Sequence, residues 1–225
     1  MSLTVSLGPV IGSLSASTLQ EMGVLSNCHV NIVQLQDSME FTNYQSELKF
    51  LTSDDNRMNK IAELASTVKD TGNTLILVDR IEAGQLLYQK LTEDNSFAVL
   101  KDSVVFVSGG TKGTTRTEHY DDIATATNKI IIATYGVAAV GINIPRIFNV
   151  MLLEPGKSFV RVIQSIGRGI RKAEDKDFVQ IWDITSSCKF AKRHLTQRKA
   201  FYKDANYPFS IEKLKYCLLY TSDAA

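Results

Sequence analysis

The chain has 225 residues, 44% of them hydrophobic and 22% charged, with a formal net charge of +1. These values are those of an ordinary globular protein of one domain plus appendages, and no apolar run is long enough to span a bilayer. The three cysteines, Cys28, Cys188 and Cys217, are too far apart for a zinc site or a disulfide framework, so we expect no metal, no membrane and a reducing, cytoplasmic setting.

Short, continuous apolar runs predict strands that are covered on both faces. They occupy residues 75–78, 104–107, 130–133, 150–153 and 179–182, and residues 30–35 are a candidate for a further strand. Between them, residues 56–69 and 81–91 carry apolar side chains at helical spacing. Alternating strands and helices predict a parallel α/β sheet, whose ligands bind at the carboxyl ends of the strands. The loops that follow Val78, Val107, Thr134 and Leu153 are therefore the candidate site.

The chain becomes basic after Asp183. No acidic residue occurs between Lys189 and Lys203, a stretch that contains six basic residues: Lys189, Lys192, Arg193, Arg198, Lys199 and Lys203. Two interpretations stay open, a surface that contacts nucleic-acid phosphates and a merely solvated helix face. The three histidines, His29, His119 and His194, sit apart and are interpreted as surface or core residues.

The strongest local pattern is Gln-x-x-Gly-Arg-x-x-Arg at residues 164–171. If residues 159–172 form a helix, Gln164, Arg168 and Arg171 share one face. Two glycines in such a helix cost roughly 1 kcal/mol each relative to alanine, which favours a close approach to a ligand or another domain. Aligned guanidinium groups suit a phosphate chain, although a solvated basic face is the competing interpretation.

This pattern resembles motif VI of superfamily 2 helicases. Residues 133–145 resemble motif V, and residues 74–91 resemble motif IV. Because the motifs occur in the family's order, the chain is similar to the second RecA-like domain of these helicases, and within them to UvsW-type phage repair and recombination helicases. The resemblance implies a P-loop NTPase-type fold, a RecA-like parallel sheet flanked by helices.

The resemblance also implies which residues face the nucleotide, ATP with Mg2+. Arg171 would act as the finger on the γ-phosphate, with Arg168 beside it and Gln164 ordering the site. Gly141, Asn143 and Gly167 would lie near the nucleotide. The family often has aspartate at the place of Asn143, and the uncharged amide leaves the role of that position in doubt.

Four residues are expected along a nucleic-acid backbone: Ser108, Gly109, Arg116 and Thr134. The implied partner is DNA, single-stranded or branched, with RNA as an alternative. Residues 109–115 are glycine-rich, but they lack the Lys-Ser/Thr pair of a phosphate-binding loop and are interpreted as an ordinary loop.

The chain shows no Walker A or Walker B sequence. Both belong to a first motor domain, which we expect in cis, so the fragment alone should not hydrolyse ATP. We divide the chain into the end of the first motor domain or the interdomain linker (1–28), a RecA-like domain (29–185), a basic helical extension (186–216) and a non-native tail (217–225). The alternative function is a non-catalytic nucleic-acid-binding RecA-like module, or a domain of an RNA-directed helicase.

Overall fold

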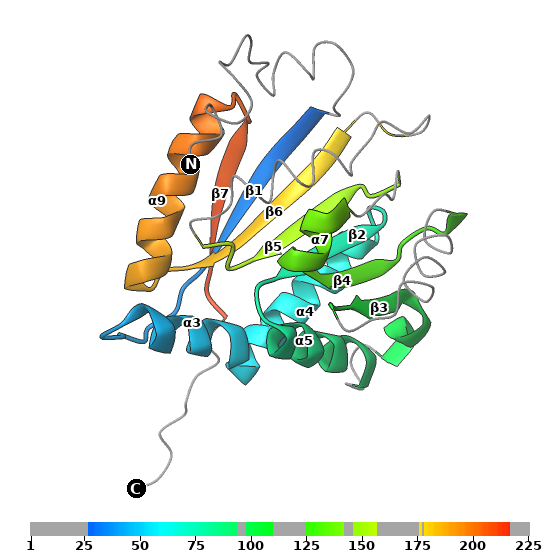
Figure 1. Cartoon of the computed structure of the whole chain (residues 1–225), viewed down its shortest axis with the longest axis horizontal. Helices are drawn as coiled ribbons and strands as arrows, with labels where there is room; N and C mark the ends of the chain where they lie inside the picture. The colour runs from blue at the N-terminus through cyan, green and yellow to red at the C-terminus, as the bar shows by residue number, and fades with distance from the viewer. Residues whose placement is uncertain are drawn as a thin grey trace, which may run out of the picture.

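A computed structural model describes residues 27–93, 98–109, 125–141, 146–156, 176 and 178–216. These residues form a seven-stranded sheet in the order β3-β4-β2-β5-β6-β1-β7, and every neighbouring pair is parallel. The strands are β1 (Asn27–Leu35), β2 (Thr74–Val78), β3 (Val104–Val107), β4 (Ile130–Thr134), β5 (Asn149–Leu153), β6 (Phe178–Ser186) and β7 (Phe209–Leu214). The parallel α/β fold predicted from the sequence is therefore confirmed (Figure 1).

Helices cover both faces of the sheet. The helical elements are α3 (Tyr44–Ser53), α4 (Asp55–Lys69), α5 (Ile81–Glu93), the 3-10 helix η1 (Ala98–Ser103), α7 (Tyr135–Gly141) and α9 (Lys189–Asp204). Apolar side chains of α4 and α5 form one core with one face of the sheet, and those of α7 and α9 form a second core with the other face. This two-sided burial explains the continuous apolar runs, since β2 and β5 are buried at every position.

All six predicted strands and both predicted helices are present. Strand β6 extends beyond its apolar run through Asp183 to Ser186, where the buried side chains of Asp183 and Ser186 have hydrogen-bond partners. Polar residues within a strand hide its length from an analysis based on hydropathy. The structure therefore lengthens β6 toward the carboxyl edge of the sheet.

Four described elements were not predicted: strand β7 and the helical elements α3, η1 and α7. Strand β7 pairs in parallel with β1 at the sheet edge, and its residues are exposed or half-buried, so it lacks a continuous apolar run. Helix α3 begins after Asn43, whose side chain accepts a hydrogen bond from the Ser46 amide. An amide oxygen at this position satisfies one of the free backbone donors of the first helical turn.

Candidate functional site at the carboxyl edge of the sheet

Ser108, Gly109 and Thr134 lie at the carboxyl ends of two neighbouring strands. Strand β3 pairs with β4 through Val107 and Ala133, so the next residues of both strands meet at the same edge. Ser108 and Thr134 are half-buried, and Gly109 is exposed with open space where a side chain would be. The structure thus brings together three of the four residues predicted to contact a nucleic-acid backbone. Arg116 lies outside the described residues.

Helix α7 begins directly after β4, as a strand-to-helix turn at the carboxyl edge. Gly136 in its first turn is exposed, and a Cβ at this position would meet nothing within 4 Å, which leaves the backbone open to a ligand. Gly141 is the last residue of this helix. The other residues expected near a nucleotide or at its γ-phosphate lie outside the described residues: Asn143, Gln164, Gly167, Arg168 and Arg171.

The chain leaves β5 through a turn that we call the exit turn, residues 154–156. Glu154 has φ 44° and Gly156 has φ 61°, both in the left-handed region. A glycine adopts that region freely, whereas a glutamate does so only when its surroundings hold it there. Glu154 is 7% exposed, so its carboxylate lies inside the protein.

The Glu154 carboxylate belongs to a buried ion-pair group, which we call the exit cluster. Its members are Asp37, Arg57 and Glu154. Arg57, which is fully buried in the first turn of α4, donates to Asp37 over 2.8 Å and also to Glu154. The Tyr216 hydroxyl also donates to Asp37. Burial raises the pKa of Glu154 to about 7, and the Arg57 and Arg198 charges offset only part of that rise.

A second group, here called the helix cluster, joins α9 to β6 through Asp183, Arg198 and Tyr202. Arg198 donates two hydrogen bonds to Asp183, of 2.8 and 2.9 Å, and Tyr202 donates a third over 2.7 Å. Burial lowers the pKa of Arg198, but the charge and hydrogen bonds of Asp183, together with the Tyr202 and Glu154 charges, outweigh burial and leave that pKa raised. Arg198 is therefore turned inward, and this member of the basic run cannot serve as an exposed phosphate contact.

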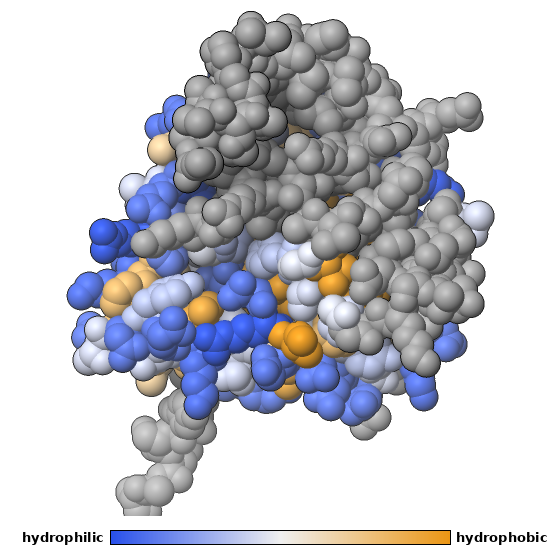
Figure 2. Space-filling view, viewed as in Figure 1, coloured by the Kyte–Doolittle hydropathy of each residue, from blue (hydrophilic) through white to orange (hydrophobic). Residues whose placement is uncertain are grey.

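The remaining basic residues of α9 leave both interpretations of the basic run open. Lys189, Lys192, Arg193 and Lys203 are exposed and Lys199 is half-buried, while the buried residues of α9 are Ala191, His194, Leu195, Arg198 and Tyr202. Figure 2 shows hydrophilic residues along the side of the molecule where α9 runs. The exposed face is basic enough to attract an anion, but exposure alone does not distinguish a phosphate contact from a solvated surface.

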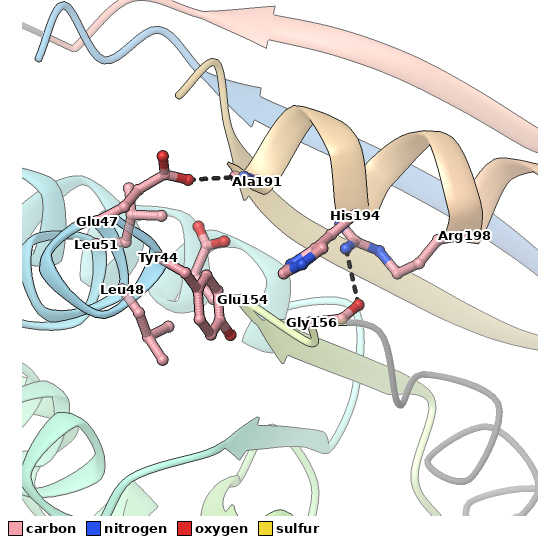
Figure 3. A pocket seen from close by; sticks show the side chains of 9 residues that line it. All are labelled: Tyr44, Glu47, Leu48, Leu51, Glu154, Gly156, Ala191, His194 and Arg198. Carbon is pink, nitrogen blue, oxygen red and sulfur yellow. Dashed lines mark hydrogen bonds between the residues drawn. The ribbon is translucent and has the colours of Figure 1, made fainter. Parts of the chain in front are cut away.

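A small pocket lies between the exit turn, α3 and α9. Figure 3 shows the side chains of Tyr44, Glu154 and His194 directed toward one another there. Glu47 of α3, which is 1% exposed, accepts hydrogen bonds from the Phe190 and Ala191 amides over 3.0 and 2.7 Å. The N-cap residue Cys188 makes no side-chain cap hydrogen bond. The Glu47 carboxylate instead accepts from the free amides of the first turn of α9 and so caps that helix.

The two buried clusters were not identified from the sequence, although signals existed. Arg57 lies four residues before Ile61 and eight before Ala65, so it belongs to the apolar face of α4. Asp183 interrupts an apolar strand run. A charge at a position where the pattern requires an apolar residue indicates a buried partner, but the sequence does not say which one.

No helix among the described residues is long and apolar enough to cross a membrane.

The sequence matches the family described as "Helicase conserved C-terminal domain" over residues 56–173. It is 27% identical, over 201 residues, to the ATP-dependent DNA helicase uvsW of Enterobacteria phage T4; the match covers 86% of this chain and 39% of the phage protein. The crystal structure of T4 UvsW superposes with a TM-score of 0.72 at 22% identity, over 84% of this chain and 42% of that one. The chain thus spans well under half of this relative.

A further solved structure shares the fold at lower identity. Domain 2 of the DEAD-box helicase Mss116p, bound to an RNA duplex, gives a TM-score of 0.56 at 14% identity, over 85% of this chain and 65% of that one. The resemblance to RecA-like helicase domains inferred from the motifs is confirmed at the level of family and fold.

Proposed function

Because the chain belongs to the family of the helicase conserved C-terminal domain, we propose that it is the second motor domain of an ATP-dependent DNA helicase or translocase, which unwinds DNA or moves its branch points. The observation that carries the proposal is the family match over residues 56–173, a stretch that contains every motif identified in the sequence. Sequence identity to a phage DNA helicase supports DNA as the nucleic acid.

In this proposal ATP with Mg2+ binds mainly to a first motor domain in cis, and this chain completes the site. Arg171 contacts the γ-phosphate, Arg168 and Gln164 support it, and Gly141, Asn143 and Gly167 lie near the nucleotide. The open backbone at Gly136 fits a ligand at the β4–α7 turn. The domain boundaries after residues 28, 185 and 216 belong to the same proposal, in which the extension packs on the sheet through α9 and β7.

The first test concerns ATP turnover by the chain alone. We expect no DNA-stimulated turnover above background, because the phosphate cradle and the magnesium site belong to the other domain. Robust turnover by a contaminant-free preparation would contradict the assignment.

The sharper test is Arg171→Ala, in this chain and in a longer protein that contains it. A guanidinium finger contributes on the order of a thousandfold to turnover, so the longer variant should lose ATP hydrolysis while it keeps DNA binding. Arg171→Lys should not restore hydrolysis, because lysine lacks the planar fork. In the isolated chain the thermal midpoint should barely move, since surface changes usually fall within about 0.5 kcal/mol. Full ATP turnover in the longer Arg171→Ala protein would remove the finger from this position.

Nucleic-acid binding is tested by fluorescence anisotropy with matched single-stranded DNA and RNA at several salt concentrations. We propose that Ser108, Gly109, Arg116 and Thr134 contact phosphates. Each cationic contact, such as that of Arg116, adds a slope of about −0.7 in log affinity against log salt for single strands. Gly109→Asp should weaken binding, because it places a negative charge on an exposed, unobstructed backbone. Lys192→Ala, on the exposed face of α9, reports whether the helix takes part. Salt-independent binding rules out a phosphate-contacting surface, and stronger binding to RNA selects the RNA-directed alternative.

A further inference from the structure

The exit turn is held from both faces of the sheet. Glu154 accepts a hydrogen bond from Arg57 of α4, and the Gly156 carbonyl accepts one from Arg198 of α9 over 3.3 Å (Figure 3). Helices α4 and α9 pack on opposite faces of the sheet. Both left-handed residues of the turn are therefore bound to a guanidinium group, and the two groups approach from opposite sides.

Arg57 links chain segments that are distant in sequence. Besides Asp37 and Glu154, it donates to the Leu51 carbonyl over 3.0 Å and to the Thr185 carbonyl over 3.4 Å. These acceptors belong to the segment after β1, the end of α3, the exit turn and the end of β6. A planar guanidinium can hold several acceptors in one fixed arrangement, which an ammonium group cannot do.

Arg198 is anchored before it reaches the turn. Its two hydrogen bonds to Asp183 fix the plane of the guanidinium, and the remaining nitrogen, Nη1, points to Gly156. Both arginines are at most 3% exposed. Stability alone does not call for this arrangement, because well-packed apolar residues often replace a buried ion pair without loss.

We propose that Arg57 and Arg198 are positioning residues that clamp the exit turn, after which Gln164, Arg168 and Arg171 follow in the sequence. The inference rests on the proposed function, since those three residues are its candidate γ-phosphate group. The clamp matters for chemistry because a displacement of about 1 Å, caused by a change far from the reacting atoms, can lower turnover on the order of a hundredfold.

The test uses the longer protein that contains this chain and compares Arg57→Lys with Glu47→Gln. Arg57→Lys keeps the positive charge but loses the planar guanidinium group that holds several acceptors at once. Glu47→Gln weakens another buried connection, between α3 and α9, that has no hydrogen bond to the exit turn. We expect Arg57→Lys to lower kcat for ATP on the order of ten- to a hundredfold, with KM and DNA affinity nearly unchanged. Glu47→Gln should lower the thermal midpoint but leave kcat within about twofold.

A second variant, Gly156→Ala, perturbs the turn without removing a charge. A Cβ at this position would lie 3.7 Å from the Tyr44 hydroxyl, an ordinary contact, so the change strains the left-handed backbone rather than the packing. It should therefore fold and still lower kcat, even if Arg57→Lys does not fold.

Arg171→Ala is measured alongside to separate the two proposals. If Arg171→Ala abolishes turnover while Gly156→Ala and Arg57→Lys retain the wild-type kcat, the clamp is wrong and the proposed function stands. The clamp is also wrong if Arg57→Lys behaves like Glu47→Gln, with a lowered thermal midpoint and a kcat within about twofold of the wild type. Full turnover in Arg171→Ala overturns the proposed finger itself.

Discussion

The exit cluster and the helix cluster both bury an arginine against carboxylates, yet they connect different parts of the chain. In the helix cluster, Arg198 and Tyr202 bind an aspartate 15 and 19 residues earlier, which fastens one helix to the adjacent strand. In the exit cluster, Arg57 binds groups 6, 20, 97 and 128 residues away. The first is a local fastening with one further bond, from Arg198 to the Gly156 carbonyl, whereas the second joins four segments at the carboxyl edge.

The two clusters also differ in charge. The helix cluster sets one guanidinium against one carboxylate, whereas the exit cluster sets one against two. Burial is the main cause that raises the pKa of Glu154 to about 7, and the negative charge of Asp37 adds to that rise. Arg198 thus neutralises a single carboxylate, Asp183. Arg57 instead lies between two carboxylates, Asp37 and Glu154, and the net charge of that group depends on pH.

The largest effect is expected for Arg57→Ala. Removing the shared donor leaves Asp37 and Glu154 buried without their guanidinium, and breaking a buried pair costs about 3–5 kcal/mol. We place this variant at the upper end of that range, measured as the free energy of unfolding in urea. A decrease of less than about 2 kcal/mol in the free energy of unfolding would show that the hydrogen bonds of Arg57 contribute little to stability.

Arg198→Ala should cost somewhat less, about 3 kcal/mol, because one carboxylate is left unpaired instead of two. The triple variant Asp183→Leu, Arg198→Met and Tyr202→Phe should recover most of that loss, since an apolar set can replace a balanced ion pair. Urea unfolding of both proteins is the measurement. If the triple variant is no more stable than Arg198→Ala, the helix cluster is not a simple fastening.

The stability of the exit cluster should depend on pH through the carboxyl group of Glu154, which has no counterpart in the helix cluster. The folded-state pKa of Glu154 is raised from 4.5 to about 7, so its contribution is fully present below pH 4.5 and is lost as the pH rises through 7. The unfolding free energy should fall between about pH 5 and pH 8 by on the order of 1–3 kcal/mol more in the wild type than in Glu154→Gln. Parallel pH profiles for the two proteins would show that Glu154 ionises normally.

The smallest changes in stability are expected for Tyr202→Phe and Tyr216→Phe, since each removes one hydroxyl that donates to an aspartate. Tyr202 is fully buried and Tyr216 is only half-buried. Tyr202→Phe should cost about 1.5–3 kcal/mol, the range for a buried hydrogen bond to a charged group, and Tyr216→Phe less than about 1 kcal/mol, because water can replace its hydroxyl. Thermal unfolding of both variants checks the order, and equal losses would remove burial as the reason for the difference.

The sheet could be predicted because its signals are local. Continuous runs such as residues 75–78 and 150–153 require cover on both faces, and the family motifs follow in order along the chain. Strand β7 escaped prediction because an exposed edge strand has no buried face to impose a pattern. Ser108, Gly109 and Thr134 lie at strand ends, since parallel strands end at a common edge, and their contact with a nucleic-acid backbone stays a prediction.

The sequence by itself determined the fold class, the family and the loops in which a site should lie, because these follow from the pattern of apolar residues and from short motifs. Only the tertiary structure decided that Arg198 faces inward and that Arg57, Asp37 and Glu154 meet. The physical reason is that the partner of a buried charge is chosen by how strands and helices pack. Arg57 lies 20 positions from Asp37 and 97 from Glu154 in the sequence. The three side chains become neighbours only when the sheet brings the ends of β1 and β5 close to the start of α4.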